Sequence, residues 1–151
     1  MSLDRLTIRL QAGRDRRIKA GHPWAFSNEI VMTPAAKALP PGSVVRLEGD
    51  DGVKHGAFHF NPHSLIAARR LSPDPDAACD AGWYRARLAE ALSLRERLFD
   101  APHYRLVHAE ADGLPGLVID RYGDEFALQA NTAGMDAATP LIVEALTELV
   151  A

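Results

Sequence analysis

Short runs in which apolar and polar residues alternate, separated by glycines and prolines, make up the first part of the chain. A period of two is typical of half-buried strands. The pattern predicts a helical turn over 14–19, loops over 22–28 and 33–42, and strands over 6–11, 29–32, 43–48, 53–60 and 65–71, with a turn at 49–52. Several short strands with one small helical turn favour a compact β-barrel over an open sheet.

The second part of the chain changes to helical spacing. Apolar residues recur every three or four positions over 81–100, and again in a stretch that ends at Val150. Between these helices, three apolar runs at 104–108, 117–122 and 125–131 predict a small antiparallel sheet. The order helix, three strands, helix departs from βαβ alternation and predicts an antiparallel α+β piece.

Proline, glycine and threonine predict how these elements connect. Pro115 and Gly116 suit the second and third positions of a type II turn over 114–117, because proline presets φ and glycine accepts a positive φ. Thr139 is the expected N-cap of the last helix, with Pro140 in its first turn, where a missing N–H leaves no hydrogen bond unmade.

A segment rich in proline and aspartate, 72–76, breaks regular pairing between the two patterns and is the expected linker. We therefore predict an α+β protein with two domains. Residues 1–73 would form a small β-barrel, and residues 74–151 the antiparallel α+β domain.

Composition is that of an ordinary soluble globular protein, with 47% hydrophobic and 25% charged residues. No apolar run is long enough to cross a bilayer, so no membrane association is expected. The single cysteine, Cys79, excludes an internal disulfide and fits a cytoplasmic protein.

The net charge of −3 conceals an asymmetry along the chain. Residues 1–70 hold 11 Lys+Arg and 6 Asp+Glu, a net of +5, whereas residues 71–151 hold 6 and 14, a net of −8; the totals are 17 and 20. A basic first half joined to an acidic second half indicates two modules, of which the first faces a polyanion.

A basic cluster followed closely by aromatic residues is the candidate RNA-binding surface. Its cations would contact phosphates, and its aromatic rings could stack on unpaired bases. The alternative is a solvated basic turn with Trp24 and Phe26 in the core, and for Trp24 core packing is favoured. The candidate RNA-binding residues are Arg14, Arg16, Arg17, Lys19, His22 and Trp24, and Phe26 is a further aromatic residue of the cluster.

Two further arginines, Arg69 and Arg70, lie on a predicted strand and are also candidates for RNA binding. Neighbouring strand residues point to opposite faces of a sheet. Only one of the two can therefore join any given surface.

The remaining reactive side chains favour structural interpretations. His55, His59 and His63 are four apart, but on a strand and turn, with no cysteine or carboxylate to complete a metal site. Cys79 is expected to be an inert thiol. No metal, cofactor-binding or catalytic residue is therefore assigned, and Walker A, G-x-S-x-G and H-E-x-x-H motifs are absent.

Carboxylates cluster around the predicted hairpin and could perform acid–base chemistry if a pocket separated their pKa values. For Asp112 and Asp124 a structural role is simpler, since both stand at predicted turns, where an aspartate accepts hydrogen bonds from nearby backbone N–H groups. The cluster comprises Glu110, Asp112, Asp120 and Asp124.

Two segments together resemble a known family. Residues 14–30 (RDRRIKAGHPWAFSNEI) resemble the start of the PUA domain of certain bacterial ribosomal RNA methyltransferases, and residues 104–124 (YRLVHAEADGLPGLVIDRYGD) are similar to the signature of their linking α+β domain. The family is the RlmI (YccW)-like, class I, S-adenosylmethionine-dependent methyltransferases of cytosine C5 in large-subunit ribosomal RNA. Both motifs occur in the expected order.

The resemblance implies a PUA domain, a linking α+β domain and a Rossmann-like catalytic domain that binds S-adenosylmethionine. This sequence ends at Ala151 without a glycine-rich cofactor loop or a Pro-Cys pair. We therefore expect an N-terminal region of such a 23S ribosomal RNA methyltransferase, with the linking domain incomplete, the catalytic domain absent, and the cofactor bound only by the full-length parent.

The expected partner is ribosomal RNA, and an exposed sheet edge would favour a homodimer. Three alternatives remain open at this point. The chain could be a stand-alone PUA-type RNA-binding adaptor without catalysis, a small hydrolase that uses Asp112 and Asp120, or a protein that docks partners through its acidic half.

Overall fold

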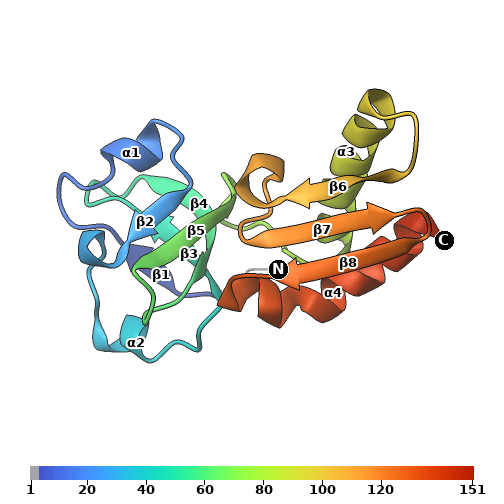
Figure 1. Cartoon of the computed structure of the whole chain (residues 1–151). Helices are drawn as coiled ribbons and strands as arrows, with labels where there is room; N and C mark the ends of the chain where they lie inside the picture. The colour runs from blue at the N-terminus through green and yellow to red at the C-terminus, as the bar shows by residue number, and fades with distance from the viewer. Residues whose placement is uncertain (1–3) are drawn as a thin grey trace. The chain divides into compact units, whose positions relative to one another are not determined.

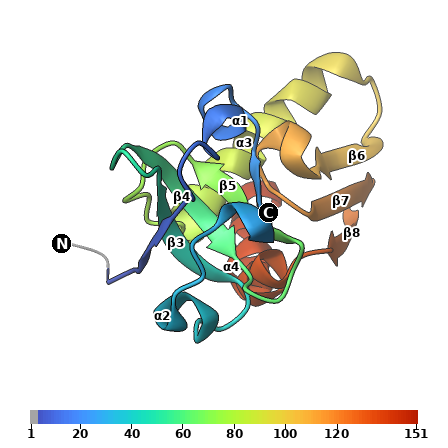
Figure 2. The ribbon, with the colours of Figure 1, turned by 90° about the vertical axis from the view of Figure 1, so that its left-hand side faces the viewer.

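The chain is described by a computed structural model that covers residues 4–151, so the first three residues of the predicted barrel lie outside the described part. It divides into two compact units, the first ending at Ala78 and the second running from Cys79 to Ala151. Figures 1 and 2 show the elements of both units from two directions.

A five-stranded sheet in the order β1-β3-β4-β5-β2 forms the first unit. Strand β1 runs parallel to β3, and every other neighbouring pair is antiparallel. The strands are β1 (Thr7–Arg9), β2 (Trp24–Phe26), β3 (Ser43–Glu48), β4 (Lys54–Phe60) and β5 (Ile66–Ser72). Three short helical turns accompany them: α1 (Arg16–Lys19), the 3₁₀ turn η1 (Ser27–Glu29) and α2 (Pro34–Lys37).

A backbone bridge brings the two edges of this sheet together. Leu10, just after β1, pairs with Ile30, just after η1. The Gln11 amide donates to the Glu29 carbonyl at 2.8 Å, and the Val31 amide donates to the Arg9 carbonyl at 2.9 Å. The sheet therefore curls into a half-barrel, which confirms the predicted barrel architecture.

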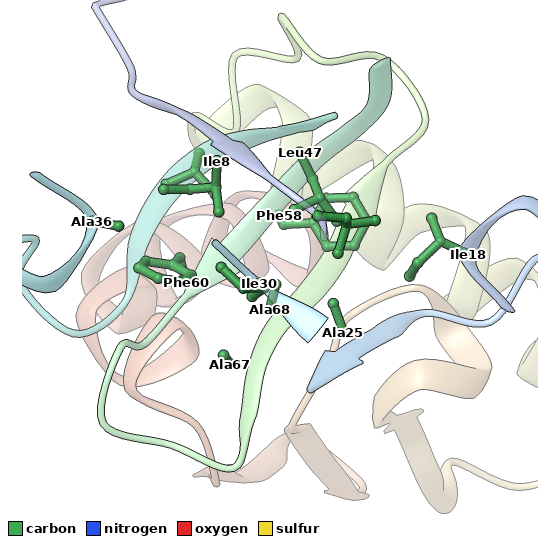
Figure 3. Close-up of a cluster of buried hydrophobic side chains, with 12 residues drawn as sticks. Ile8, Ile18, Ala25, Ile30, Ala36, Leu47, Phe58, Phe60, Ala67 and Ala68 are labelled. Atoms are coloured by element: carbon green, nitrogen blue, oxygen red, sulfur yellow. The ribbon is translucent and has the colours of Figure 1, made fainter. Parts of the chain in front are cut away.

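Because successive side chains of a strand point to opposite faces, every second side chain points into the curled sheet. The core is made by aliphatic residues and two phenylalanines from β4, all with at most 3% exposure. Figure 3 shows these side chains converging from several strands and from α1; among them are Ile8, Ile18, Leu47, Phe58, Phe60 and Ala68.

Three predictions for the first unit were wrong. Residues 24–26, predicted as loop, form β2, because they pair with β5 in the register Trp24↔Arg69 and Ala25↔Ala68. The strand predicted over 29–32 is reduced to the single Ile30 bridge. The predicted loop 33–42 contains α2, whose N-cap Thr33 accepts a hydrogen bond from the Ala36 amide at 3.1 Å.

The predicted linker begins as strand, since Ser72 is the last residue of β5. The residues after it remain hydrogen-bonded to the first unit. Arg5 donates to the Pro75 and Ala77 carbonyls at 2.9 and 2.7 Å, and Arg46 pairs with Asp76 at 2.7 Å. The second compact unit therefore begins only at Cys79.

The second unit has the predicted order helix, three strands, helix. Its antiparallel sheet has the order β6-β7-β8, and α3 and α4 contact each other. Asp80 caps α3 by accepting a hydrogen bond from the Trp83 amide at 2.9 Å. The elements are α3 (Ala81–Leu98), β6 (His103–His108), the 3₁₀ turn η2 (Ala109–Asp112), β7 (Leu117–Tyr122), β8 (Glu125–Ala130) and α4 (Ala133–Val150).

The predicted type II turn over 114–117 agrees with the structure, where the Leu117 amide donates to the Leu114 carbonyl at 3.0 Å and Gly116 has a φ of 77°. The predicted start of the last helix was wrong. Thr132, not Thr139, is its N-cap and accepts from the Met135 amide at 3.2 Å, and Pro140 lies inside the helix on an exposed position.

Among residues 4–151, neither of the two long helices nor any shorter one combines the length and apolar character needed to span a bilayer.

The core of the first unit makes a direct prediction for stability. Phe58 is 0% exposed, so Phe58→Ala should lower the free energy of unfolding by about 3–5 kcal/mol through lost burial and a residual cavity. Urea unfolding can be followed through Trp24 alone in a Trp83→Phe background. Leu65→Ala, at a side chain that is 72% exposed, is the control and should stay within about 0.5 kcal/mol. Equal effects of both variants would contradict the assigned core.

Candidate nucleic-acid interface

Three of the arginines that the sequence predicts to bind RNA line one depression on the first unit. It has a volume of about 480 Å³. Because its lining includes three arginines and only one glutamate, the depression carries an excess of positive charge. The lining residues are Gly13, Arg14, Arg16, Arg17, Ala20 and Glu29.

The arginines and the lysine of this region differ in their partners. Within residues 4–151, the exposed side chains of Arg14 and Arg16 have no hydrogen bond or ion pair. Lys19, in contrast, pairs with Asp15 at 3.1 Å and with Asp51 at 3.3 Å. The hydrogen bond to Asp15, assisted by Asp51, raises the pKa of Lys19. Lys19 is therefore charged but locally neutralised, and Arg14 and Arg16 supply the uncompensated charge.

Arg17 is held by Glu29, which the sequence did not single out as a binding residue, and by Phe26, one of the aromatic residues that follow the basic cluster. Its Nη2 atom lies 3.0 Å from Glu29 Oε1, and its guanidinium carbon lies 5.0 Å from the centre of the Phe26 ring. Glu29 stands three residues after Phe26 and accepts a hydrogen bond from the Phe26 amide at 3.0 Å. A glutamate three residues after the start of a helical turn is typical of a capping box, in which its side chain accepts a hydrogen bond from the first amide. This spacing was the sequence signal that could have identified Glu29.

Trp24 lies outside the core, contrary to the packing predicted for it. Ala25 takes the inward position on β2, and Trp24 is half-buried on the other face. The guanidinium carbon of Arg69 lies 5.1 Å from the centre of the Trp24 ring. The His22 ring meets Trp24 edge-on, and His22 Nδ1 accepts a hydrogen bond from the Trp24 amide at 3.2 Å. Trp24 of β2, Arg69 of β5 and the preceding His22 therefore form a cluster of aromatic and cationic side chains.

Arg70 lies on the opposite face from Arg69, as the alternation along β5 predicts. It pairs in register with the core residue Phe58, and its guanidinium carbon is 5.5 Å from the centre of that ring. Arg70 Nη2 donates to the Ile18 carbonyl of α1 at 3.2 Å. Burial lowers the pKa of Arg70. Arg70 thus supports the basic turn from within the unit, and it does not line the depression.

The histidines spaced four apart, His55, His59 and His63, do not assemble a metal site. In the described part of the chain, no group of three or more His, Cys, Asp or Glu side chains could hold a metal ion. His55 and His59 are buried on β4, and His63 is exposed in the following turn. Burial lowers the pKa of His59 to about 4.

Two of the four hairpin carboxylates, Asp112 and Asp120, are engaged in ion pairs. Arg95 binds Asp112 through two hydrogen bonds of 2.6 and 2.8 Å. Burial alone would raise the pKa of Asp112, but the hydrogen bonds from Arg95 and the His108 amide outweigh it and lower that pKa. The hydrogen bond from Arg105 likewise lowers the pKa of Asp120. Since neither pKa is raised, neither carboxyl is suited to act as a general acid near neutral pH.

Comparison with known proteins identifies relatives of the chain. A family model described as a PUA-like domain matches residues 8–73. Ribosomal RNA large subunit methyltransferase I from Aliivibrio fischeri is 38% identical over 95% of this chain. The protein of the same name from Alteromonas mediterranea is 34% identical over 93% of it. In both comparisons the chain spans 36% of the relative's length.

Among solved structures, one from Streptococcus mutans that is assigned to the SAM-dependent methyltransferases superposes with a TM-score of 0.79. The match covers 95% of this chain and 38% of that one, at 16% sequence identity. At this identity the likeness concerns the fold alone, and it extends over both units.

Burial of His59 predicts a pH dependence of stability. Its folded-state pKa of about 4 lies below the unfolded value near 6.5, so the unfolded chain binds the extra proton and stability falls as pH decreases from 6.5 to 4. The expected loss between pH 7 and pH 5 is about 2 kcal/mol. His59→Gln should remove this part of the pH dependence in urea unfolding. An unchanged slope in the variant would contradict the assignment.

Proposed function

We propose that this chain, which carries a PUA-like domain and is homologous to the ribosomal RNA large subunit methyltransferase I proteins, binds structured ribosomal RNA through the first unit. The observation that carries the proposal is the convergence of Arg14, Arg16 and Arg17 on one depression. Positive charge concentrated in this way contacts phosphates and depends little on base sequence.

The second unit would serve as a scaffold. Of the residues from Cys79 onward, 6 are Lys or Arg and 12 are Asp or Glu, which makes this unit acidic and unfavourable for the RNA backbone. We infer that it positions the catalytic part of a longer protein. Contact with RNA is thereby assigned to the first unit.

The full-length protein is proposed to be an S-adenosylmethionine-dependent 23S ribosomal RNA cytosine-C5 methyltransferase of the cytoplasm. Support comes from the name of the curated relatives and from the SAM-dependent assignment of the solved structure. The chain spans about 36% of the length of the curated relatives it matches, so we assign cofactor binding and methyl transfer to the remainder of such a protein. No catalytic role is proposed for Asp112 or Asp120.

Removing the two unpartnered arginines tests the RNA-binding proposal. Arg14→Ala combined with Arg16→Ala should weaken binding to a 23S ribosomal RNA hairpin about tenfold, since each exposed ion pair contributes up to about 1 kcal/mol. The slope of log K against log[salt] should become shallower by about 2, one unit for each lost phosphate contact. Fluorescence anisotropy at several salt concentrations measures both quantities.

The control removes the same charge elsewhere. Arg85 and Arg97 are exposed residues of α3 in the second unit, and Arg85→Ala with Arg97→Ala should leave affinity and salt slope unchanged. Binding that does not depend on salt, or an equal loss in both double variants, would contradict the proposal.

A further inference from the structure

Glu29 is a buried carboxylate beside the arginine-lined depression. The residue is only 6% exposed. Its Oε1 atom accepts two hydrogen bonds of 3.0 Å, one from Arg17 Nη2 and one from the Phe26 amide. A negative charge at the edge of a surface meant for RNA opposes binding through simple electrostatics. Its position therefore calls for another role.

The geometry around Arg17 supplies that role. Glu29 holds one edge of the guanidinium, and the Phe26 ring lies 5.0 Å from its central carbon. The side chain is nevertheless 54% exposed. A planar guanidinium has five N–H donors in a rigid fork that matches a phosphate. Holding one edge of the fork on the protein leaves other donors available in a fixed orientation.

Arg14 and Arg16 differ from Arg17 in this respect. They line the same depression, but no partner within residues 4–151 fixes their side chains. An unrestrained cation contributes charge over a range of positions and loses conformational entropy when it is ordered by a ligand. A restrained arginine has already lost that freedom, so its contact with the ligand is pre-organised.

We propose that Arg17 is a pre-organised phosphate-binding residue of this surface and that Glu29 is its positioning residue. The ligand is a phosphodiester of the RNA backbone. Arg17 forms charge-assisted hydrogen bonds with it in a fixed geometry, while Arg14 and Arg16 supply long-range attraction and phosphate contacts that no protein partner orients. This inference rests on the proposed RNA-binding function and assigns separate roles to residues that carry the same charge.

Two conservative substitutions separate positioning from net charge. Arg17→Lys keeps the charge but replaces the planar fork with a single ammonium group. Glu29→Gln keeps an oxygen acceptor for the Phe26 amide and adds one unit of positive charge to the surface. Net charge alone predicts no change for the first variant and tighter binding for the second. Positioning predicts weaker binding for the first and no gain for the second.

The experiment measures affinity and salt slope for a 23S ribosomal RNA hairpin and for an oligouridylate. Arg17→Lys should weaken binding to both RNAs by about fivefold to tenfold at an unchanged salt slope, since a bidentate charged contact is lost while the charge remains. Glu29→Gln should weaken binding about threefold, because a neutral acceptor holds Arg17 less firmly than a carboxylate. The matched control, Arg16→Lys, should stay within about twofold.

The outcomes separate this inference from the proposed function. If the unsubstituted protein binds RNA with a steep salt slope but Arg17→Lys binds as well as Arg16→Lys, or Glu29→Gln binds more tightly, the positioning inference is overturned and RNA binding stands. A loss confined to the ribosomal RNA hairpin, with oligouridylate binding unchanged, would overturn the phosphate assignment in favour of a contact specific to that RNA. No binding of either RNA would overturn both proposals. Should a thermal melt show that Glu29→Gln does not fold, the comparison of RNA affinity between Arg17→Lys and Arg16→Lys decides the result.

Discussion

The candidate interface depends on the backbone bridge that closes the first unit. Leu10 and Ile30 pair across the two edges of the sheet, and hydrogen bonds from the Gln11 and Val31 amides lie on either side of that pair. These contacts fix both ends of the segment that contains α1, β2 and η1. Arg17 on α1 can therefore reach Glu29 at the end of η1, twelve residues later in the chain.

Charge on the first unit is organised in three ways. Lys19 and Arg17 have carboxylate partners, Arg70 reaches from the core side to the Ile18 carbonyl, and Arg14 and Arg16 face solvent. A count of basic residues treats all of these as equal, whereas the structure gives each a distinct role. Only the unpartnered cations produce the excess charge that attracts a polyanion at a distance, and only a restrained cation meets it with a fixed geometry.

Local sequence patterns were sufficient where an element is set by its own residues. Alternation located β3, β4 and β5, and the Pro115-Gly116 pair located the turn before β7. Elements that depend on distant partners were missed. Three residues are too few to identify β2 by pattern, and its pairing partner β5 begins forty residues later. Met135 and Ala138 are buried ahead of Pro140, so tertiary packing begins α4 at Ala133 with Thr132 as its N-cap, against the local preference for proline in a first turn. The role of Glu29 is likewise non-local, and the sequence could indicate the arginines but not the carboxylate that orders one of them.

The central claim is that the first unit contacts RNA through the surface around α1. Amide chemical shifts, recorded by NMR on the whole chain during titration with a 23S ribosomal RNA hairpin, test it most directly. The account predicts that the largest changes fall within residues 13–29 and diminish as salt is added. Changes centred on residues 79–151, or spread evenly over both units, would contradict it.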